Sequence, residues 1–220
     1  MKKTIIQIVL GVVIVALAYL LINSILNPVR FDNEYNHRRE ACAERLKAIR
    51  VLEEQYKLTY GVYTGSFDTL FNRLTNEDSL KVVSKVINYD VIPEDVDINE
   101  IPETEAIKKG YKTLKEIYVN PLEKLREENK FSLSNEEMLN LRYVPYPKGA
   151  KLAWDLAAKT LDKNGFQVPV FECKVDLDKL MSDCDKQLVV NKIDELEKAN
   201  RFPGWKVGSL DEAITDGNFE

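Results

Sequence analysis

The sequence predicts an α+β protein that is fixed to a membrane at its N-terminus. Three observations favour this class: an apolar run over residues 5–22, an amphipathic helical pattern over residues 33–60, and alternating apolar residues on both sides of Asn164-Gly165. The expected fold is an N-terminal transmembrane helix continued by a long amphipathic helix, then a small antiparallel β-sheet with a C-terminal helix. The predicted units are a transmembrane anchor over 1–27, a juxtamembrane amphipathic helix over 28–61 and a soluble α+β domain over 62–220.

The apolar run IIQIVLGVVIVALAYLLI extends from Ile5 to Ile22 and contains one Gln. As a helix with a rise of about 1.5 Å per residue, this run and its flanks can cross a hydrocarbon layer of about 30 Å. Lys2 and Lys3 also provide the basic start of a secretory signal, and Ala16 and Ala18 fit its cleavage pattern. Because the apolar run continues beyond Ala18, we expect an uncleaved anchor that contacts the lipid bilayer through Ile5 to Ile22.

The charges that flank the span give a divided answer about its orientation. Lys2, Lys3 and the terminal amine precede the span, and several arginines follow it: Arg30, Arg38, Arg39 and Arg45. A count of basic residues slightly favours a cytoplasmic domain, whereas a basic tail before a single span is typical of a signal anchor. We predict a single-pass inner membrane protein whose soluble domain is extracytoplasmic (periplasmic).

A second helix is expected beyond the anchor. Asn27-Pro28 predicts a bend or a break, because proline disfavours the helical conformation of the residue before it. The helix then runs from Asn33 to Tyr60, where Gly61 ends it. Its apolar residues recur at spacings of three and four and form one stripe: Cys42, Leu46, Ile49, Leu52, Tyr56 and Tyr60. We predict that this stripe extends beyond what the domain covers and is a candidate interaction surface for partner helices or a partner sheet.

The sequence of the first half of the soluble domain predicts mainly short helices. We expect a short helix that begins near Ser66, a helix near residues 78–87, an acidic connector, a short helix from Glu103 to Lys109 and an extended segment from Tyr111 to Val119. The connector is expected to be solvated because no basic residue lies between Lys85 and Lys108.

The second half predicts an antiparallel meander of residues 141–146, 151–161 and 166–175. Asn164-Gly165 indicates a tight hairpin turn between the last two segments. The segment KLAWDLAAKTL also fits a helix, since it is rich in alanine and its leucines match the helical period. An amphipathic helix from Asp185 to Asn200 follows, and Phe202, Trp205 and Val207 are expected to hold the tail against the sheet.

Composition limits the partners and the redox chemistry. Basic residues are scattered among acidic ones in a chain of net charge −5, so no nucleic acid partner is expected. Of the three cysteines, Cys173 and Cys184 are spaced so that a short loop could close into a disulfide in an oxidising compartment, leaving Cys42 over. The alternative is three reduced thiols packed as small hydrophobic residues.

Catalytic, cofactor-binding and metal-binding residues are not predicted. His37 is the single histidine, and we expect a solvated side chain near the membrane rather than a base or zinc ligand. The acidic clusters at residues 95–99 and 176–185 lack the glycine and the final glutamate of a calcium loop. The sequence also lacks phosphate-binding glycine motifs and a G-x-S-x-G elbow. We therefore expect no enzyme activity and no cofactor.

Several patches resemble a family of uncharacterised single-span envelope proteins of Bacteroidota. The matching pieces are NPVRF, ERLKAIR, YGVYTGSFDTL, YVPY, VPVFE, FPGWKVGSLDEA and GNFE. This resemblance implies a single-span topology and no particular activity. The layout is also similar to that of type IV pilins and pseudopilins, but the glutamate that pilins have at the fifth position of the mature helix is absent, since Ala16 lies five residues after Gly11.

We predict a non-enzymatic, membrane-anchored envelope protein that acts as an assembly or scaffold subunit of a multiprotein complex, in a homo- or hetero-oligomer with other envelope proteins. One alternative is a pilin-like or pseudopilin-like subunit of a secretion or surface-fibre system. A further alternative is an envelope enzyme, although no nucleophile, base and orienting group can be assembled from these residues.

Overall fold

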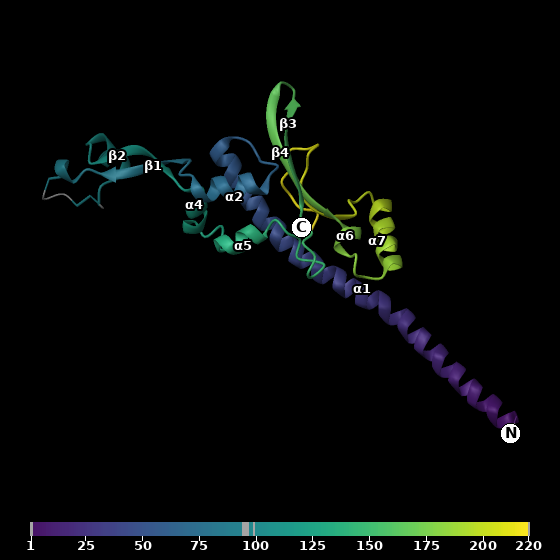
Figure 1. The fold of residues 1–220 in the computed structure, drawn as a ribbon. Coiled ribbons are helices and arrows are strands. Elements are labelled where there is room, and N and C mark those ends of the chain that lie inside the picture. Colours follow the sequence, from purple (N-terminus) through teal and green to yellow (C-terminus); the bar gives the residue numbers. More distant parts are fainter. Residues whose placement is uncertain (1, 94–96, 99, 220) are drawn as a thin grey trace.

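The computed structural model describes residues 2–93, 97–98 and 100–219, and its α+β class confirms the prediction (Figure 1). In chain order the elements are α1 (Lys2–Tyr60), α2 (Phe67–Asn76), β1 (Leu80–Ile87), the 3₁₀ helix η1 (Tyr89–Val91), α3 (Glu103–Lys108), β2 (Lys112–Val119), α4 (Pro121–Glu127), α5 (Asn135–Asn140), β3 (Asp155–Lys163), β4 (Phe166–Asp176), α6 (Leu177–Leu180), α7 (Lys186–Lys198) and β5 (Gly204–Gly208). The strands form two separate antiparallel sheets, β1-β2 and β3-β4-β5.

Helix α1 is continuous over 59 residues, which corresponds to about 90 Å at the usual helical rise. Pro28 lies inside it, so the break that Asn27-Pro28 was predicted to allow as the alternative to a bend does not occur. Pro28 removes one backbone N–H and restricts Asn27, but the loss of one helical bond does not end a helix whose neighbouring turns are intact. Figure 1 shows a single long rod whose N-terminal half is bare and whose C-terminal half carries the domain.

The three-stranded sheet has the order β3-β4-β5. The β3–β4 hairpin turns at Asn164 and Gly165, whose φ angles of 56° and 84° are both positive, as a two-residue type I′ turn requires. This geometry confirms the predicted hairpin, and it excludes the helical alternative for KLAWDLAAKTL. The third strand is β5, which pairs with β4 from Gly204 opposite Asp176 to Gly208 opposite Glu172.

The strand predicted at residues 141–146 is wrong. Its one ladder contact is an isolated bridge between Tyr143 and Ala153. Pro145 and Pro147 have no backbone N–H to donate to a ladder, so this segment cannot continue the pairing. The sheet gains its third strand on the other side of β4, from the tail that contains Trp205 and Val207.

The second sheet is a two-stranded arm, β1 and β2, paired from Leu80 opposite Val119 to Ile87 opposite Lys112. The extended segment predicted at 111–119 is confirmed, whereas the helix predicted near 78–87 is wrong. The sequence of β1, LKVVSKVI, is rich in β-branched residues, which lose side-chain freedom in a helix and pack well on a pleated strand. Figure 1 shows this arm standing away from the rest of the domain.

The core lies around the C-terminal half of α1, against the three-stranded sheet and the short helices. Residues of β4 alternate between a buried face, with Phe171, Cys173 and Val175, and an outer face with charged side chains. Ser66 caps α2 and Asp185 caps α7, each by accepting hydrogen bonds from backbone N–H groups of the first helical turn. The short helix near Ser66, the helix after Pro102 and the C-terminal helix are therefore confirmed.

Candidate functional site

The N-terminal half of α1 is a candidate membrane span by its length and composition. From Val9 to Arg30 every side chain is exposed except that of Asn23, which is half-buried. The next side chain, Phe31, is 8% exposed because the domain covers it. An exposed apolar surface of this size is unfavourable in water, which favours a lipid environment for it. The structure thus agrees with an anchor that leads directly into the folded domain.

The apolar stripe that the sequence assigned to partners lies inside the chain's own core. Four of its residues, Cys42, Leu46, Ile49 and Leu52, are 0% exposed, Tyr56 is 4% exposed, and Tyr60 is half-buried. The three-stranded sheet and short helices of the same chain cover this face of α1. The stripe therefore stabilises the fold and leaves no open surface for a partner helix, contrary to the expectation that it extends beyond its domain.

Glu53 lies on the same stripe, between Ile49 and Tyr56, and is 0% exposed. Its Oε2 accepts a hydrogen bond of 3.0 Å from the backbone N–H of Thr64, which ties the turn after α1 back to the helix. Its Oε1 has no hydrogen-bond partner among the described residues. Burial raises the pKa of this carboxyl to about 8, against the opposing effect of the Thr64 N–H. Sequence reasoning missed Glu53, although an acidic residue at a stripe position was the signal.

Arg38 continues the stripe toward the membrane and is 4% exposed. Its guanidinium makes two parallel hydrogen bonds of 2.6 and 2.9 Å to the carboxylate of Asp183 and a third, of 2.7 Å, to the carbonyl of Leu180. The Arg38 Nε also donates to Glu34 at 2.7 Å. These hydrogen bonds lower the pKa of Asp183. The cluster fastens α1 to the loop after α6, and it was likewise missed although Arg38 precedes Cys42 at stripe spacing.

The three cysteines are all free. Cys42 and Cys173 are buried and Cys184 is half-buried, so the disulfide proposed between Cys173 and Cys184 is not formed in this structure. Burial raises the pKa of Cys42 to about 12 and also raises the pKa of Cys173. Neither thiol carries the thiolate that nucleophilic or redox chemistry uses near neutral pH.

His37 is exposed, and its Nε2 lies 2.8 Å from the hydroxyl of Tyr146. In the described part of the chain, no group of three His, Cys, Asp or Glu side chains could hold a metal ion. The acidic cluster at 176–185 is engaged in the fold: Asp176 pairs with Lys179, Asp183 pairs with Arg38, and Asp185 caps α7. The other acidic cluster, at 95–99, lies largely outside the described residues.

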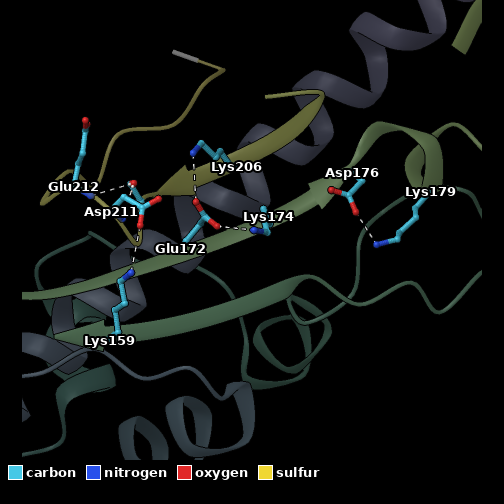
Figure 2. Close-up of polar contacts among 9 residues, drawn as sticks. Lys159, Glu172, Lys174, Asp176, Lys179, Lys206, Asp211 and Glu212 are labelled. Atoms are coloured by element: carbon cyan, nitrogen blue, oxygen red, sulfur yellow. Dashed lines mark hydrogen bonds and ion pairs between the residues drawn. The ribbon is translucent and has the colours of Figure 1, made fainter. Parts of the chain in front are cut away.

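Charged side chains on the outer face of the sheet and in the adjoining tail form several separate groups of ion pairs (Figure 2). Glu172, 9% exposed, lies between Lys174, at 2.8 Å from Oε1, and Lys206, at 3.3 Å from Oε2. Lys159 of β3 reaches Asp211 of the tail at 3.3 Å. Ser209 accepts hydrogen bonds from the backbone N–H groups of Asp211 and Glu212. These contacts hold β5 and the tail on the sheet.

The β1–β2 arm is the clearest apolar surface outside the span. On one face Val83, Leu114 and Tyr118 are 59%, 52% and 63% exposed. Charged residues alternate with them, because Lys81 lies opposite Tyr118 and Val83 lies opposite Glu116. Helix α3 packs against β2, and neither strand has a second neighbour among the described residues. The arm therefore exposes apolar side chains and two free strand edges.

No protein-family model, curated protein or solved structure matches this chain.

Proposed function

We propose that the chain is a non-enzymatic, membrane-anchored assembly or scaffold subunit of a multiprotein complex in the cell envelope. The observation that carries the proposal is the β1–β2 arm, which stands away from the core and combines exposed apolar side chains with unpaired strand edges. Strand edges of this kind bind extended segments of other proteins through backbone hydrogen bonds. The buried charges Glu53, Arg38 and Glu172 are each engaged in bonds that support the fold rather than gathered around a reactive centre.

In this proposal α1 holds the domain on the periplasmic face of the inner membrane, with lipid around Ile5 to Ile22. The exposed apolar half of the helix supports the membrane contact. The arm lies at the end of the domain far from the N-terminus, where it can reach partners away from the bilayer (Figure 1). The partner surface is thus the arm and not the stripe from Cys42 to Tyr60, which the core occupies.

Site-specific photo-crosslinking in living cells tests this function. A photoreactive amino acid is placed at Val83 or Tyr118 on the arm and, as a control, at Phe166 on the β3–β4 hairpin, which is 75% exposed. We expect discrete crosslinked products from the arm positions and none from Phe166. Products of twice the chain mass would indicate a homo-oligomer, and other masses a hetero-oligomer. Uncrosslinked monomer at both arm positions would contradict an assembly role.

A pilin-like or pseudopilin-like subunit is the second candidate, and the continuity of α1 through Pro28 favours it. One long helix with a bare apolar half and a sheet packed on the other half can bundle with copies of itself through the bare half. N-terminal sequencing of the mature protein separates the two candidates. Processing inside residues 1–28 supports the pilin-like subunit, and a start at Met1 or Lys2 supports the uncleaved anchor.

A further inference from the structure

A hollow of about 660 Å³ lies where α1, α7 and β5 meet. We call it the Tyr35 pocket. The aromatic and basic residues that line it are Tyr35 and Arg39 of α1, Lys192 of α7, Arg201, and Trp205 and Lys206 of β5. Pockets of 300–1,000 Å³ are typical of small-ligand sites. Figure 1 places α7 beside α1 on the side of the domain toward the bare half of the helix. This pocket is separate from the β1–β2 arm, and Lys206 is the residue it shares with the ion pairs of the outer sheet face.

The lining is positively charged in a chain whose net charge is −5. Four cations and one acid, Glu195, border the hollow. Glu195 neutralises Lys192 at 2.9 Å, and Glu172, outside the hollow, shares its charge with Lys206 at 3.3 Å. Arg39 donates a hydrogen bond of 3.0 Å to the carbonyl of Phe219. Because a carbonyl is neutral, this bond does not compensate the positive charge of Arg39. The guanidinium of Arg201 makes no hydrogen bond or ion pair with any described residue.

Aromatic rings form the wall behind these cations. The rings of Tyr35 and Trp205 lie 5.2 Å apart, Lys192 lies 5.1 Å above the ring of Tyr35, and Arg39 lies 5.9 Å from that of Trp205. The Tyr35 hydroxyl has no hydrogen-bond partner among the described residues. Burial raises the pKa of Tyr35, so this hydroxyl stays protonated and can donate a hydrogen bond. The pocket therefore offers hydrogen-bond donors and positive charge to an anion that is rich in acceptors. Its aromatic rings offer a flat apolar surface to the rest of the ligand.

We propose that the Tyr35 pocket binds a phosphate monoester, with the phosphate held by Arg39, Arg201 and the Tyr35 hydroxyl. Guanidinium groups match phosphate oxygens in geometry and charge, and several converging cations favour a dianion over a carboxylate. The phosphate could come from a soluble ester or from a lipid headgroup, because α1 places Tyr35 nine residues beyond Leu26, about 13 Å along the axis from the end of the apolar helix. Both sources present the same group to the same side chains.

The test uses the full chain in nanodiscs of phosphatidylcholine, with the emission of its two tryptophans and its thermal midpoint as readouts. The first experiment adds glycerol 3-phosphate at constant ionic strength. The second experiment replaces one tenth of the lipid by phosphatidic acid, whose headgroup is the same phosphate monoester. A saturable change with the soluble ester identifies a soluble ligand, and a change with phosphatidic acid alone identifies a lipid.

Two variants and a matched control connect the response to the pocket. Arg201→Gln should weaken binding about tenfold, the loss expected for one charge-assisted phosphate contact. Tyr35→Phe keeps the ring and should weaken binding about threefold by removing one neutral hydrogen bond. Lys186→Gln removes the same charge from an exposed position of α7 outside the pocket and should change the affinity less than twofold. The absence of a saturable response in both experiments would overturn the proposal. A loss of affinity in Lys186→Gln equal to that in Arg201→Gln would also overturn it.

Discussion

At the scale of single residues, Glu53 is a buried acid whose ionisation the core disfavours. Its carboxyl is fully buried in α1, and one oxygen has no partner among the described residues. An ionised carboxylate in such a site lacks the solvation that water gives it in the unfolded chain. The folded protein therefore keeps Glu53 protonated up to a pKa of about 8, whereas the unfolded chain releases the proton near 4.5. The neutral acid still accepts the hydrogen bond from Thr64.

This difference predicts how stability depends on pH. Because the pKa of Glu53 is higher in the folded than in the unfolded chain, its effect on stability does not change with pH below 4.5. Between pH 4.5 and about 8 the free energy of unfolding falls progressively, and above pH 8 it is constant again. The total loss should be on the order of several kcal/mol. Glu53→Gln keeps the acceptor for Thr64 and should remove this loss, so the variant should be more stable than the parent at pH 9. Thermal unfolding of the full chain in detergent at pH 5, 7 and 9 measures the effect.

Glu54→Gln is the control for that experiment, because Glu54 is the exposed neighbour of Glu53. It should leave the pH profile unchanged. If Glu53→Gln showed the same decline with pH as the parent, Glu53 would not be the group that titrates.

Arg38 and Asp183 illustrate a second residue-scale effect, because burial makes the two partners unequal. The side chain of Arg38 is 5% exposed and that of Asp183 is 47% exposed. Arg38→Gln should destabilise the fold by about 2–3 kcal/mol, since it removes the hydrogen bond to Leu180 and the three charged bonds to Asp183 and Glu34. Asp183→Asn should cost less, about 1 kcal/mol, because the amide oxygen of Asn can still accept a hydrogen bond from Arg38, and Arg38 keeps its bonds to Glu34 and Leu180. Denaturant unfolding of both single variants and the double variant checks this order, and a larger cost for Asp183→Asn would contradict it.

At the scale of elements, β5 depends on a glycine that the sequence does not mark. Gly208 has a φ of +74°, and a Cβ there would collide with the carbonyl of Phe171 in β4. Gly165 in the hairpin turn has a φ of +84° but open space around it. Gly165→Ala should therefore cost about 1 kcal/mol, for the backbone conformation alone. Gly208→Ala should cost clearly more, about 3 kcal/mol, because β5 must also move. Thermal unfolding of the two variants compares them, and equal costs would show that the contact with Phe171 is not tight.

Local signals in the sequence predicted some elements and missed others for physical reasons. The Asn164-Gly165 turn and the Asp185 cap depend on neighbouring residues, so the hairpin and α7 could be predicted. The third strand of the sheet could not be predicted, because β5 pairs with β4 across about thirty residues of sequence. No local pattern favours it over residues 141–146, which were expected on the other side of the hairpin. The stripe on α1 was visible, but whether it faces a partner or its own core depends on the packing of the whole chain. The Tyr35 pocket joins residues from three distant segments, which no spacing indicates.

At the scale of the whole molecule, α1 joins a candidate membrane span and a helix of the core in one element. Its exposed apolar half ends at Arg30, and the core begins at Phe31 with no intervening linker. In the proposed anchored arrangement, a domain connected in this way is held at a fixed height above the bilayer. The β1–β2 arm then lies at the far end of the domain from the N-terminus (Figure 1), whereas the Tyr35 pocket is lined by α7 and by the part of α1 close to the candidate span. The direction of this rod across the membrane decides which compartment the arm reaches.

We expect the domain to be periplasmic, and cysteine labelling tests this directly. In a Cys184→Ala background the remaining native thiols, Cys42 and Cys173, are buried. Phe166→Cys places a thiol at a hairpin position that is 75% exposed. A membrane-impermeant maleimide should label it in cells with a permeabilised outer membrane, whereas Lys3→Cys, before the span, should be labelled after lysis alone. The reverse pattern would place the domain in the cytoplasm, because a single span puts these two positions on opposite sides of the membrane.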